Sequence, residues 1–306
     1  MTMISIFTRR VDLIRGGNAG QATLLLAIVA TAILSLVYAT VYISHLGAAR
    51  VASANASDAV VISAATWEAR GLNMIAALND GILQCFRVIR WTCVIWAALA
   101  IAACSGVGMP AFAAYSRQAI KMIRSYWKCA RELADWSVRV KSAIPPLALA
   151  ETISLSKTLK VAGTIHPFDP RGPHDGRNTL ELHVAPGPPL YLVDALGPIA
   201  RVPGRIKKWK WAGRAVGQIS AVIDGAIRAI IGGDPRPIRM LVPESDFPKR
   251  QKVRFAGFRS SNPLPIPDAD WSRERRFFFE SFAEPYGGSA MEMSWRSRLT
   301  EKPEER

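Results

Sequence analysis

Acidic residues and cysteines are scarce in this sequence of 306 residues. Asp and Glu number 24 against 39 Lys and Arg, and the resulting net charge of +15 favours anionic partners such as lipid headgroups, nucleic acid or acidic proteins. The four cysteines contain no C-x-x-C pair, so they predict neither a zinc site nor a disulfide framework. We expect those in apolar surroundings to act as small apolar residues.

The motifs of common enzymes are also missing. The sequence has no Walker loop, no G-x-G-x-x-G and no G-x-S-x-G, which leaves nucleotide binding and the usual hydrolase elbow without support. Three histidines and three carboxylates lie between His166 and His183, but their spacing matches no zinc pattern and suits ordinary turns. We therefore expect a protein that is not an enzyme and that holds no cofactor and no metal.

One long apolar run is present near the N-terminus. Residues 16–49 contain no Asp, Glu, Lys or Arg, and residues 22–43 are almost continuously apolar. As a helix this stretch is about 33 Å long, enough to cross a hydrocarbon core of about 30 Å. It is also longer than the apolar region of a cleaved signal, so we predict a retained transmembrane helix at 22–43. Arg9, Arg10 and Arg15 precede it, and the positive-inside rule places residues 1–21 in the cytoplasm.

Small side chains recur at every fourth residue of the predicted span. They are Thr23, Ala27, Thr31, Ser35 and Ala39. A stripe of this kind lets a second membrane helix approach closely, and we predict that it is a helix-packing face. The alternative is that these residues face lipid, since Ala, Thr and Ser are common in membrane helices.

The next part of the chain alternates between helical and interrupted sequence. Residues 44–90 contain no proline and predict a helical extension of the span. Residues 91–116 are a second uncharged stretch, interrupted by Ser105, Gly106 and Pro110. They predict a second apolar helix, either a kinked second span or a buried or interfacial helix.

Residues 117–150 predict a basic amphipathic helix that ends near Pro145 and Pro146. Its cations recur at helical spacing and are Arg117, Lys121, Arg124, Lys128 and Arg131. Such a face suits an anionic membrane surface, and the alternative is a solvated face on a helix whose other side packs in a core.

Residues 151–306 predict a small, loop-rich domain of the α+β class, because proline and glycine cluster between short strand-like runs. The runs at 179–184, 190–193, 249–258 and 275–282 predict strands, and residues 213–231 predict a helix. A second membrane-surface candidate interleaves cations with indoles at Lys207, Lys208, Trp209, Lys210 and Trp211. These could contact headgroups or stack on single-stranded bases, and the attached span favours the membrane.

Several short segments together resemble a known family. Gly20 and Gln21 open the apolar helix, Asn55 and Asp58 lie in an A-N-A-S-D-A segment, and Leu72 and Asn73 begin L-N-M-I-A. Near the C-terminus, Glu284 and Tyr286 lie in A-E-P-Y, and Trp295 and Arg298 lie in W-R-S-R-L. This arrangement resembles the membrane-anchored TadE/TadG-like proteins of the Flp (Tad) pilus assembly machinery, over about the first 80 and the last 25 residues.

The resemblance implies a bacterial inner-membrane protein that acts as a non-catalytic, pilin-like or accessory component of a pilus or secretion apparatus. It implies other pilus assembly or pilin-like membrane proteins as partners, besides the lipid bilayer, and a periplasmic C-terminal domain. A second span at 91–116 would instead return that domain to the cytoplasm. Prepilin-type substrates carry a Glu where this sequence has Leu25, which speaks against cleavage after Gly20.

A hypothesis of a different class is a membrane-surface scaffold that binds anionic lipid or nucleic acid through the basic helix and the 207–211 segment. Nucleic acid is the less favoured ligand, because no RNA- or DNA-binding motif accompanies these residues.

Overall fold

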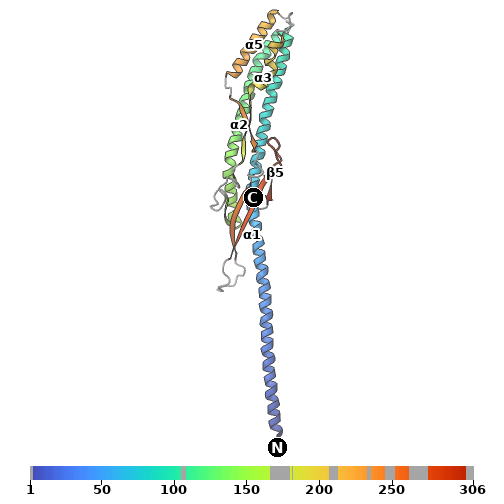
Figure 1. Ribbon diagram of the computed structural model, residues 1–306, viewed down its shortest axis with the longest axis vertical. Helices are drawn as coiled ribbons and strands as arrows, with labels where there is room; N and C mark the ends of the chain where they lie inside the picture. The colour runs from blue at the N-terminus through green and yellow to red at the C-terminus, as the bar shows by residue number, and fades with distance from the viewer. Residues whose placement is uncertain are drawn as a thin grey trace. The chain divides into compact units, whose positions relative to one another are not determined.

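The computed structural model describes residues 3–104, 108–165, 180, 182–206, 213–232, 236–244, 252–261 and 275–300. These residues form an α+β fold that is mostly helical, with two small sheets (Figure 1). The helices are α1 (Met3–Ala103), α2 (Met109–Thr158), α3 (Leu192–Ala200), α4 (Val202–Ile206) and α5 (Gly213–Ile231). The strands are β1 (Ala162–Ile165), β2 (Val184–Leu190), β3 (Ile238–Pro243), β4 (Val253–Ser261), β5 (Arg275–Tyr286) and β6 (Arg296–Thr300).

The chain divides into two compact units. Unit 1 comprises Met1–Ala56 with Phe258–Phe279, and unit 2 comprises Ser57–Gly257 with Glu280–Arg306.

Helix α1 continues from the apolar segment through the predicted extension without a break. Within the described residues, it is the one helix long and apolar enough to cross a membrane, and none of its most apolar 18-residue window is buried. The expected long N-terminal helix with an apolar half is therefore present. In the extension, several apolar residues are buried, among them Val60, Val61, Leu72 and Ile75.

The expected second apolar helix at 91–116 is not a single helix. Helix α1 ends at Ala103 and helix α2 begins at Met109, so a turn falls inside the uncharged stretch. Pro110 occupies the first turn of α2, where its missing N–H has no helical partner to lose. A side chain on Gly108 would meet the backbone of Ala102 and Ala103 at about 3 Å, so the chain reverses direction tightly here.

Helix α2 runs through Pro145 and Pro146 and ends at Thr158, so the expected helix end near residue 150 is wrong. Each interior proline disfavours a helix by about 3 kcal/mol. Burial on both sides of the prolines opposes this cost, because Val140, Ile144 and Ala148 are all buried.

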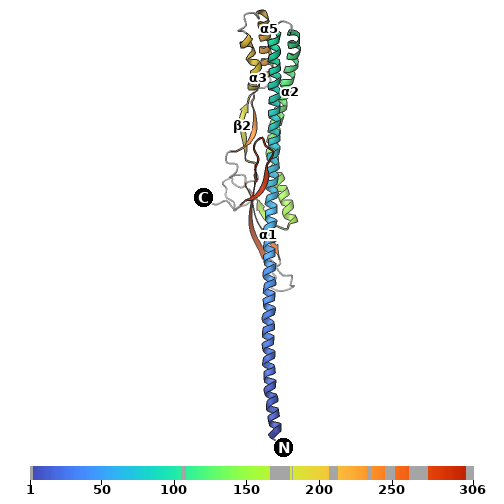
Figure 2. The same cartoon turned by 90° about the vertical axis from the view of Figure 1, so that its right-hand side faces the viewer.

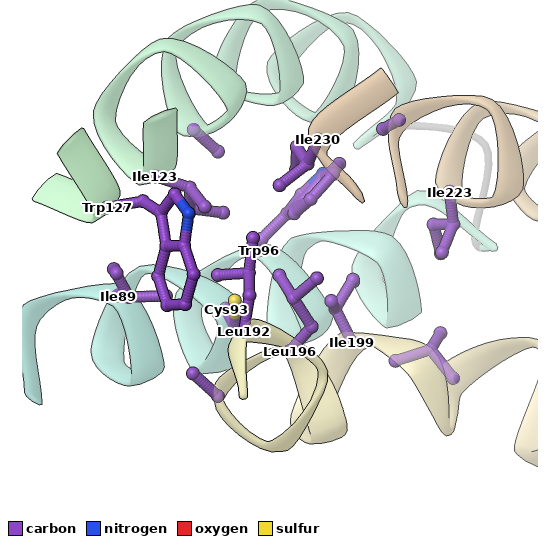
Figure 3. Packing of buried hydrophobic residues seen from close by; sticks show 14 of the residues in the cluster. Ile89, Cys93, Trp96, Ile123, Trp127, Leu192, Leu196, Ile199, Ile223 and Ile230 are labelled. Atoms are coloured by element: carbon purple, nitrogen blue, oxygen red, sulfur yellow. The ribbon is translucent and has the colours of Figure 1, made fainter. Parts of the chain in front are cut away.

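Helices α1 and α2 lie side by side through unit 2, and α3 and α5 cover the end of this pair (Figure 2). A large apolar core joins the four helices; α1 contributes Ile89, Cys93 and Trp96, and α2 contributes Ile123 and Trp127. Leu192, Leu196 and Ile199 enter this core from α3, and Ile223 and Ile230 enter from α5 (Figure 3). The residues after 151 therefore share their core with α1 and α2. The expected helix at 213–231 is confirmed as α5.

The strands form a four-stranded sheet in the order β1-β4-β5-β6 and a two-stranded sheet of β2 and β3. Strands β2 and β3 are antiparallel, with an irregularity between Pro186 and Pro189. Prolines fit here because a two-stranded sheet consists only of edges. The expected strand at 190–193 is wrong, since Leu190 ends β2 and α3 begins at Leu192. A second core packs Leu72 and Ile75 of α1 and Ile144 of α2 against Leu241 and Trp295.

Candidate functional site

The helix segments and the C-terminal segments that carry the family resemblance meet in unit 2. We call this contact the C-terminal seam; it joins residues 57–79 of α1 to residues 281–298 and to Leu241. The partners are separated by more than 160 residues in sequence.

Asn73 makes the most complete polar contact of the seam. Its side-chain amide donates to the carbonyl oxygen of Trp295 over 3.1 Å, and the backbone N–H of Trp295 donates to Asn73 Oδ1 over 3.0 Å. One side chain thus satisfies both backbone groups of a residue just before β6, as a neighbouring strand would do. Leu72, the preceding motif residue, is buried in the same apolar core as the Trp295 ring.

Asn79 lies six residues, or about 1.7 turns, further along α1 and is completely buried. Its Nδ2 donates to two carbonyl oxygens, that of Leu241 on β3 and that of Ala290, each over 2.8 Å. A buried carbonyl oxygen without a hydrogen-bond donor lowers the stability of the fold. Because Asn79 supplies a donor to both carbonyls, it holds α1 against β3 and against the segment around Ala290.

Ser281 of β5 forms hydrogen bonds with two neighbouring residues of α1, Ser57 and Asp58. Ser57 Oγ donates to Ser281 Oγ over 2.6 Å, and Ser281 Oγ donates to Asp58 Oδ1 over 2.7 Å. Further along, the hydroxyls of Thr66 and Ser297 lie 2.8 Å apart. These contacts hold one face of α1 against β5 and β6.

Glu284 and Arg298 are direct partners in the antiparallel pairing of β5 with β6. Arg298 donates to Glu284 Oε1 from Nε over 3.0 Å and from a terminal nitrogen over 2.7 Å. Lys252 lies 4.0 Å from the other carboxylate oxygen, and the Arg298 guanidinium lies 4.9 Å from the centre of the Tyr286 ring. Three of the four C-terminal motif residues therefore form one cluster.

Two glycines permit close approach, Gly71 between α1 and α2 and Gly288 within the seam. A side-chain carbon on Gly71 would lie 2.5 Å from Ile144 Cγ1, so α1 and α2 approach each other closely here. A side-chain carbon on Gly288 would overlap the Trp295 ring, whose indole N–H donates to the carbonyl of Ser289 over 3.2 Å.

Asn55 is exposed, and Gln21 is exposed at the start of the apolar stretch. Neither takes part in the seam. The predicted helix-packing residues Thr23, Ala27, Thr31, Ser35 and Ala39 are all exposed. The Thr31 hydroxyl donates to the carbonyl of Ala27 over 2.7 Å, and that of Ser35 donates to the carbonyl of Thr31 over 2.8 Å. These hydroxyls are thus satisfied within their own helix, as a hydrocarbon environment requires.

The basic residues of α2 do not form one uniform free surface. Arg117, Lys121 and Lys128 are exposed, and Lys128 pairs with Glu132 over 3.8 Å. Arg124 donates to the carbonyl of Ala229 in the last turn of α5 over 2.9 Å, where a cation is favourable. Arg131 lies 5.8 Å from the centre of the Trp127 ring.

Residues 207–211 and, apart from His183, the histidine and carboxylate group at 166–183 lie outside the described residues. Within the described part of the chain, no group of three or more His, Cys, Asp or Glu side chains could hold a metal ion. Cys85 and Cys93 are buried, and burial raises the pKa of the Cys93 thiol to about 12. Burial and the neighbouring Cys129 thiol raise the pKa of Cys85 to about 11.

Sequence reasoning missed Ser281, Thr66 and Ser297 as members of the seam, and Lys252 as a neighbour of Glu284. Single serines, threonines and lysines carry no spacing signal, so only the fold reveals them. The seam is suited to holding two segments together, because its side chains bind each other and backbone groups.

Comparisons with protein-family models, with curated proteins and with solved structures give no match for this chain.

Proposed function

We propose that this chain is a non-catalytic, TadE/TadG-like component of an Flp (Tad) pilus assembly system or a related secretion apparatus. It is anchored in the bacterial inner membrane by residues 22–43 and acts as a pilin-like or accessory protein. The observation that carries the proposal is the C-terminal seam. The motif residues Asp58, Leu72 and Asn73 contact the segments that contain Glu284, Trp295 and Arg298.

The seam supports the resemblance because the separate motifs of the resemblance share one structural role, which is to hold α1 against the C-terminal segments. Short motifs that match by chance have no reason to lie against each other in the fold. Here Asn73 binds Trp295 and Glu284 binds Arg298, and all four residues belong to the motifs of the resemblance.

The anchor also fits a pilin-like arrangement. The apolar half of α1 is exposed, and the same helix continues into the core of unit 2. With a single span and a cytoplasmic N-terminus, unit 2 lies on the extracytoplasmic side, where partners of a pilus would be found.

Deletion and complementation in the source bacterium test the proposal. Loss of the gene should remove Flp-type surface pili, counted by electron microscopy, and the wild-type gene should restore them. Pili in normal number on the deletion strain would contradict it.

Separate variants test whether the span packs against other membrane helices through its small-residue stripe. Thr31→Leu with Ser35→Leu fills the small-residue stripe, whereas Val29→Leu with Ile33→Leu changes residues about 200° away around the helix. We expect the first pair to reduce pili and co-purifying membrane partners, and the second pair to leave both intact. Equal behaviour of the two pairs would refute packing through the stripe.

A further inference from the structure

The last residues of β4 and the first residues of β5 belong to the same unit as the part of α1 that follows the apolar stretch. Arg259 donates to the carbonyl oxygen of Ala52 over 3.3 Å, and Phe258–Phe279 belongs to the same compact unit as the first 56 residues. Ala52 lies nine residues past Ile43, which is about 13 Å along a helix axis. The headgroup layer covers about 5 to 7 Å of this distance. An extended arginine side chain spans most of the remainder.

The unit presents aromatic rings and cations together at this position. The Phe278 side chain is 76% exposed, and its ring centre lies 5.8 Å from that of Phe258. The guanidinium of Arg276 lies 5.3 Å from the centre of the Phe258 ring, and Arg276 and Arg50 are exposed. We call Arg50, Phe258, Arg259, Arg276 and Phe278 the aromatic-arginine patch.

Among the described residues 21–56, 258–261 and 275–279, the Lys, Arg, Asp and Glu residues are four arginines, at positions 50, 259, 275 and 276. Asp268, Asp270 and Glu274 belong to the segment between β4 and β5, outside the described residues. Arginines close to a membrane surface attract anionic lipid headgroups. Moving a solvent-exposed phenylalanine ring from water into an apolar or interfacial layer lowers the free energy.

We propose that the aromatic-arginine patch binds the anionic phosphodiester headgroups of the leaflet at the Ile43 end of the span. The arginines pair with lipid phosphates, and Phe278 enters the interface beside them. This inference rests on the membrane anchoring in the proposed function. Unit 1 then contacts the bilayer at two places, the span and the aromatic-arginine patch. The second contact restricts the motion of the patch strands β4 and β5 relative to the membrane.

Site-directed spin labelling of the full chain in nanodiscs tests the proposal. With the four native cysteines replaced by alanine, one label is placed at Ser260→Cys, between patch residues, and another at Thr40→Cys, within the span. Collision with a water-soluble nickel complex is compared between discs of phosphatidylglycerol and discs of phosphatidylcholine. We expect the label at position 260 to be several-fold better protected in the anionic discs, and the label at position 40 to be protected in both.

Matched variants identify the residues responsible. Arg276→Gln with Phe278→Ser should return the label at position 260 to aqueous accessibility in anionic discs. Arg139→Gln with Trp136→Ser removes another exposed arginine stacked on an aromatic ring, at 5.1 Å on α2, and should leave the protection unchanged. If both variants keep the protection, or both lose it, the assignment to this patch is wrong.

The label at position 40 separates the two proposals. Protection at position 40 with equal exposure of position 260 in both lipids would overturn the patch and leave the anchor intact. Exposure at position 40 would overturn the anchor and the patch together. A third outcome would also overturn lipid binding. In it, position 260 is equally accessible in the two lipids but becomes protected when a single-stranded oligonucleotide is added to the phosphatidylcholine discs. Amide hydrogen exchange across residues 275–286 in the two lipids repeats the comparison without removing the cysteines.

Discussion

Asn73 and Trp295, 222 residues apart, exchange two hydrogen bonds, so that one side chain of α1 pairs with the backbone at the start of the last strand. This contact fixes where the C-terminal segment lies along the helix. It is also the point where the apolar ring of Trp295 enters the core beside Leu72.

Replacing Asn73 with Leu should destabilise unit 2 by about 2 to 3 kcal/mol, because two backbone groups lose their partners while the branched skeleton of the side chain is kept. Thermal unfolding of the full chain in detergent measures the change. Asn55→Ala, at an exposed position of the same helix, is the control and should have almost no effect. An unchanged midpoint for Asn73→Leu would show that the contact contributes nothing.

Asn79→Asp should be more damaging than Asn79→Leu. The amide of Asn79 donates to two carbonyl oxygens in a fully buried position, and an ionised carboxylate would face both of them without a proton. We expect a loss of about 3 to 5 kcal/mol near neutral pH, with partial recovery at acidic pH as the carboxyl group gains a proton. Chemical denaturation at two pH values tests this. Equal stability of the two variants at both pH values is incompatible with donation to the carbonyls.

Glu284 and Arg298 should show a favourable coupling energy of about 0.5 to 1 kcal/mol in a double-mutant cycle, as expected for a cross-strand ion pair. The variants are Glu284→Gln, Arg298→Met and their combination, measured by denaturant unfolding at low and high salt. The pair Lys128 and Glu132, whose side chains are 81% and 61% exposed, is the matched control. Its coupling should be smaller and should vanish first with salt. A stronger coupling for the control pair would reverse our ranking of the two sites.

Cysteine alkylation should follow burial and pKa. Burial raises the pKa of Cys93 from its ordinary value of 9.0 to about 12, so very little of this thiol is ionised at pH 8. Cys129 is exposed and should be the first of the four to react with a maleimide, as read by mass spectrometry of the native chain. Rapid labelling of Cys93 in the folded protein would contradict its placement in the core.

The same shifts predict a loss of stability at high pH. Because the folded-state pKa values of Cys85 and Cys93 are raised to about 11 and 12, the stabilisation from their protonated forms is complete below about pH 9. It is lost as pH rises through 11 and 12. Cys93→Ala should reduce the slope of unfolding free energy against pH in this range, whereas Asn55→Ala, at an exposed position away from the thiols, is the control and should leave the slope unchanged. An unchanged slope for Cys93→Ala would contradict the assignment.

Topology should show one span. Alkaline phosphatase and a cytoplasmic fluorescent reporter, fused in turn after Asp80 and after Arg306, should both report the extracytoplasmic side. A cytoplasmic signal at Arg306 would mean that the turn between α1 and α2 does not keep residues 91–116 out of the membrane.

The sequence by itself determined the helices that have a strong local signal, whether of composition or of periodicity. The long uncharged run, the proline-free extension and the helix at 213–231 depend on local composition, and each is present as expected. Local signals failed at residues 91–116 and at Pro145 and Pro146. In the first case a turn with glycine and proline splits the stretch, and in the second case burial of Val140, Ile144 and Ala148 keeps the helix continuous.

Only the tertiary structure decided which residues form the C-terminal seam. Asn73 and Glu284 were identified by resemblance, but nothing in the sequence says that Asn73 binds the backbone of Trp295 or that Ser281 bridges Ser57 and Asp58. Helix formation depends on neighbours within a few residues, and the sequence therefore specifies it locally. Contacts between residues more than 200 positions apart depend on how the intervening helices and strands pack, and that information exists only in the folded chain.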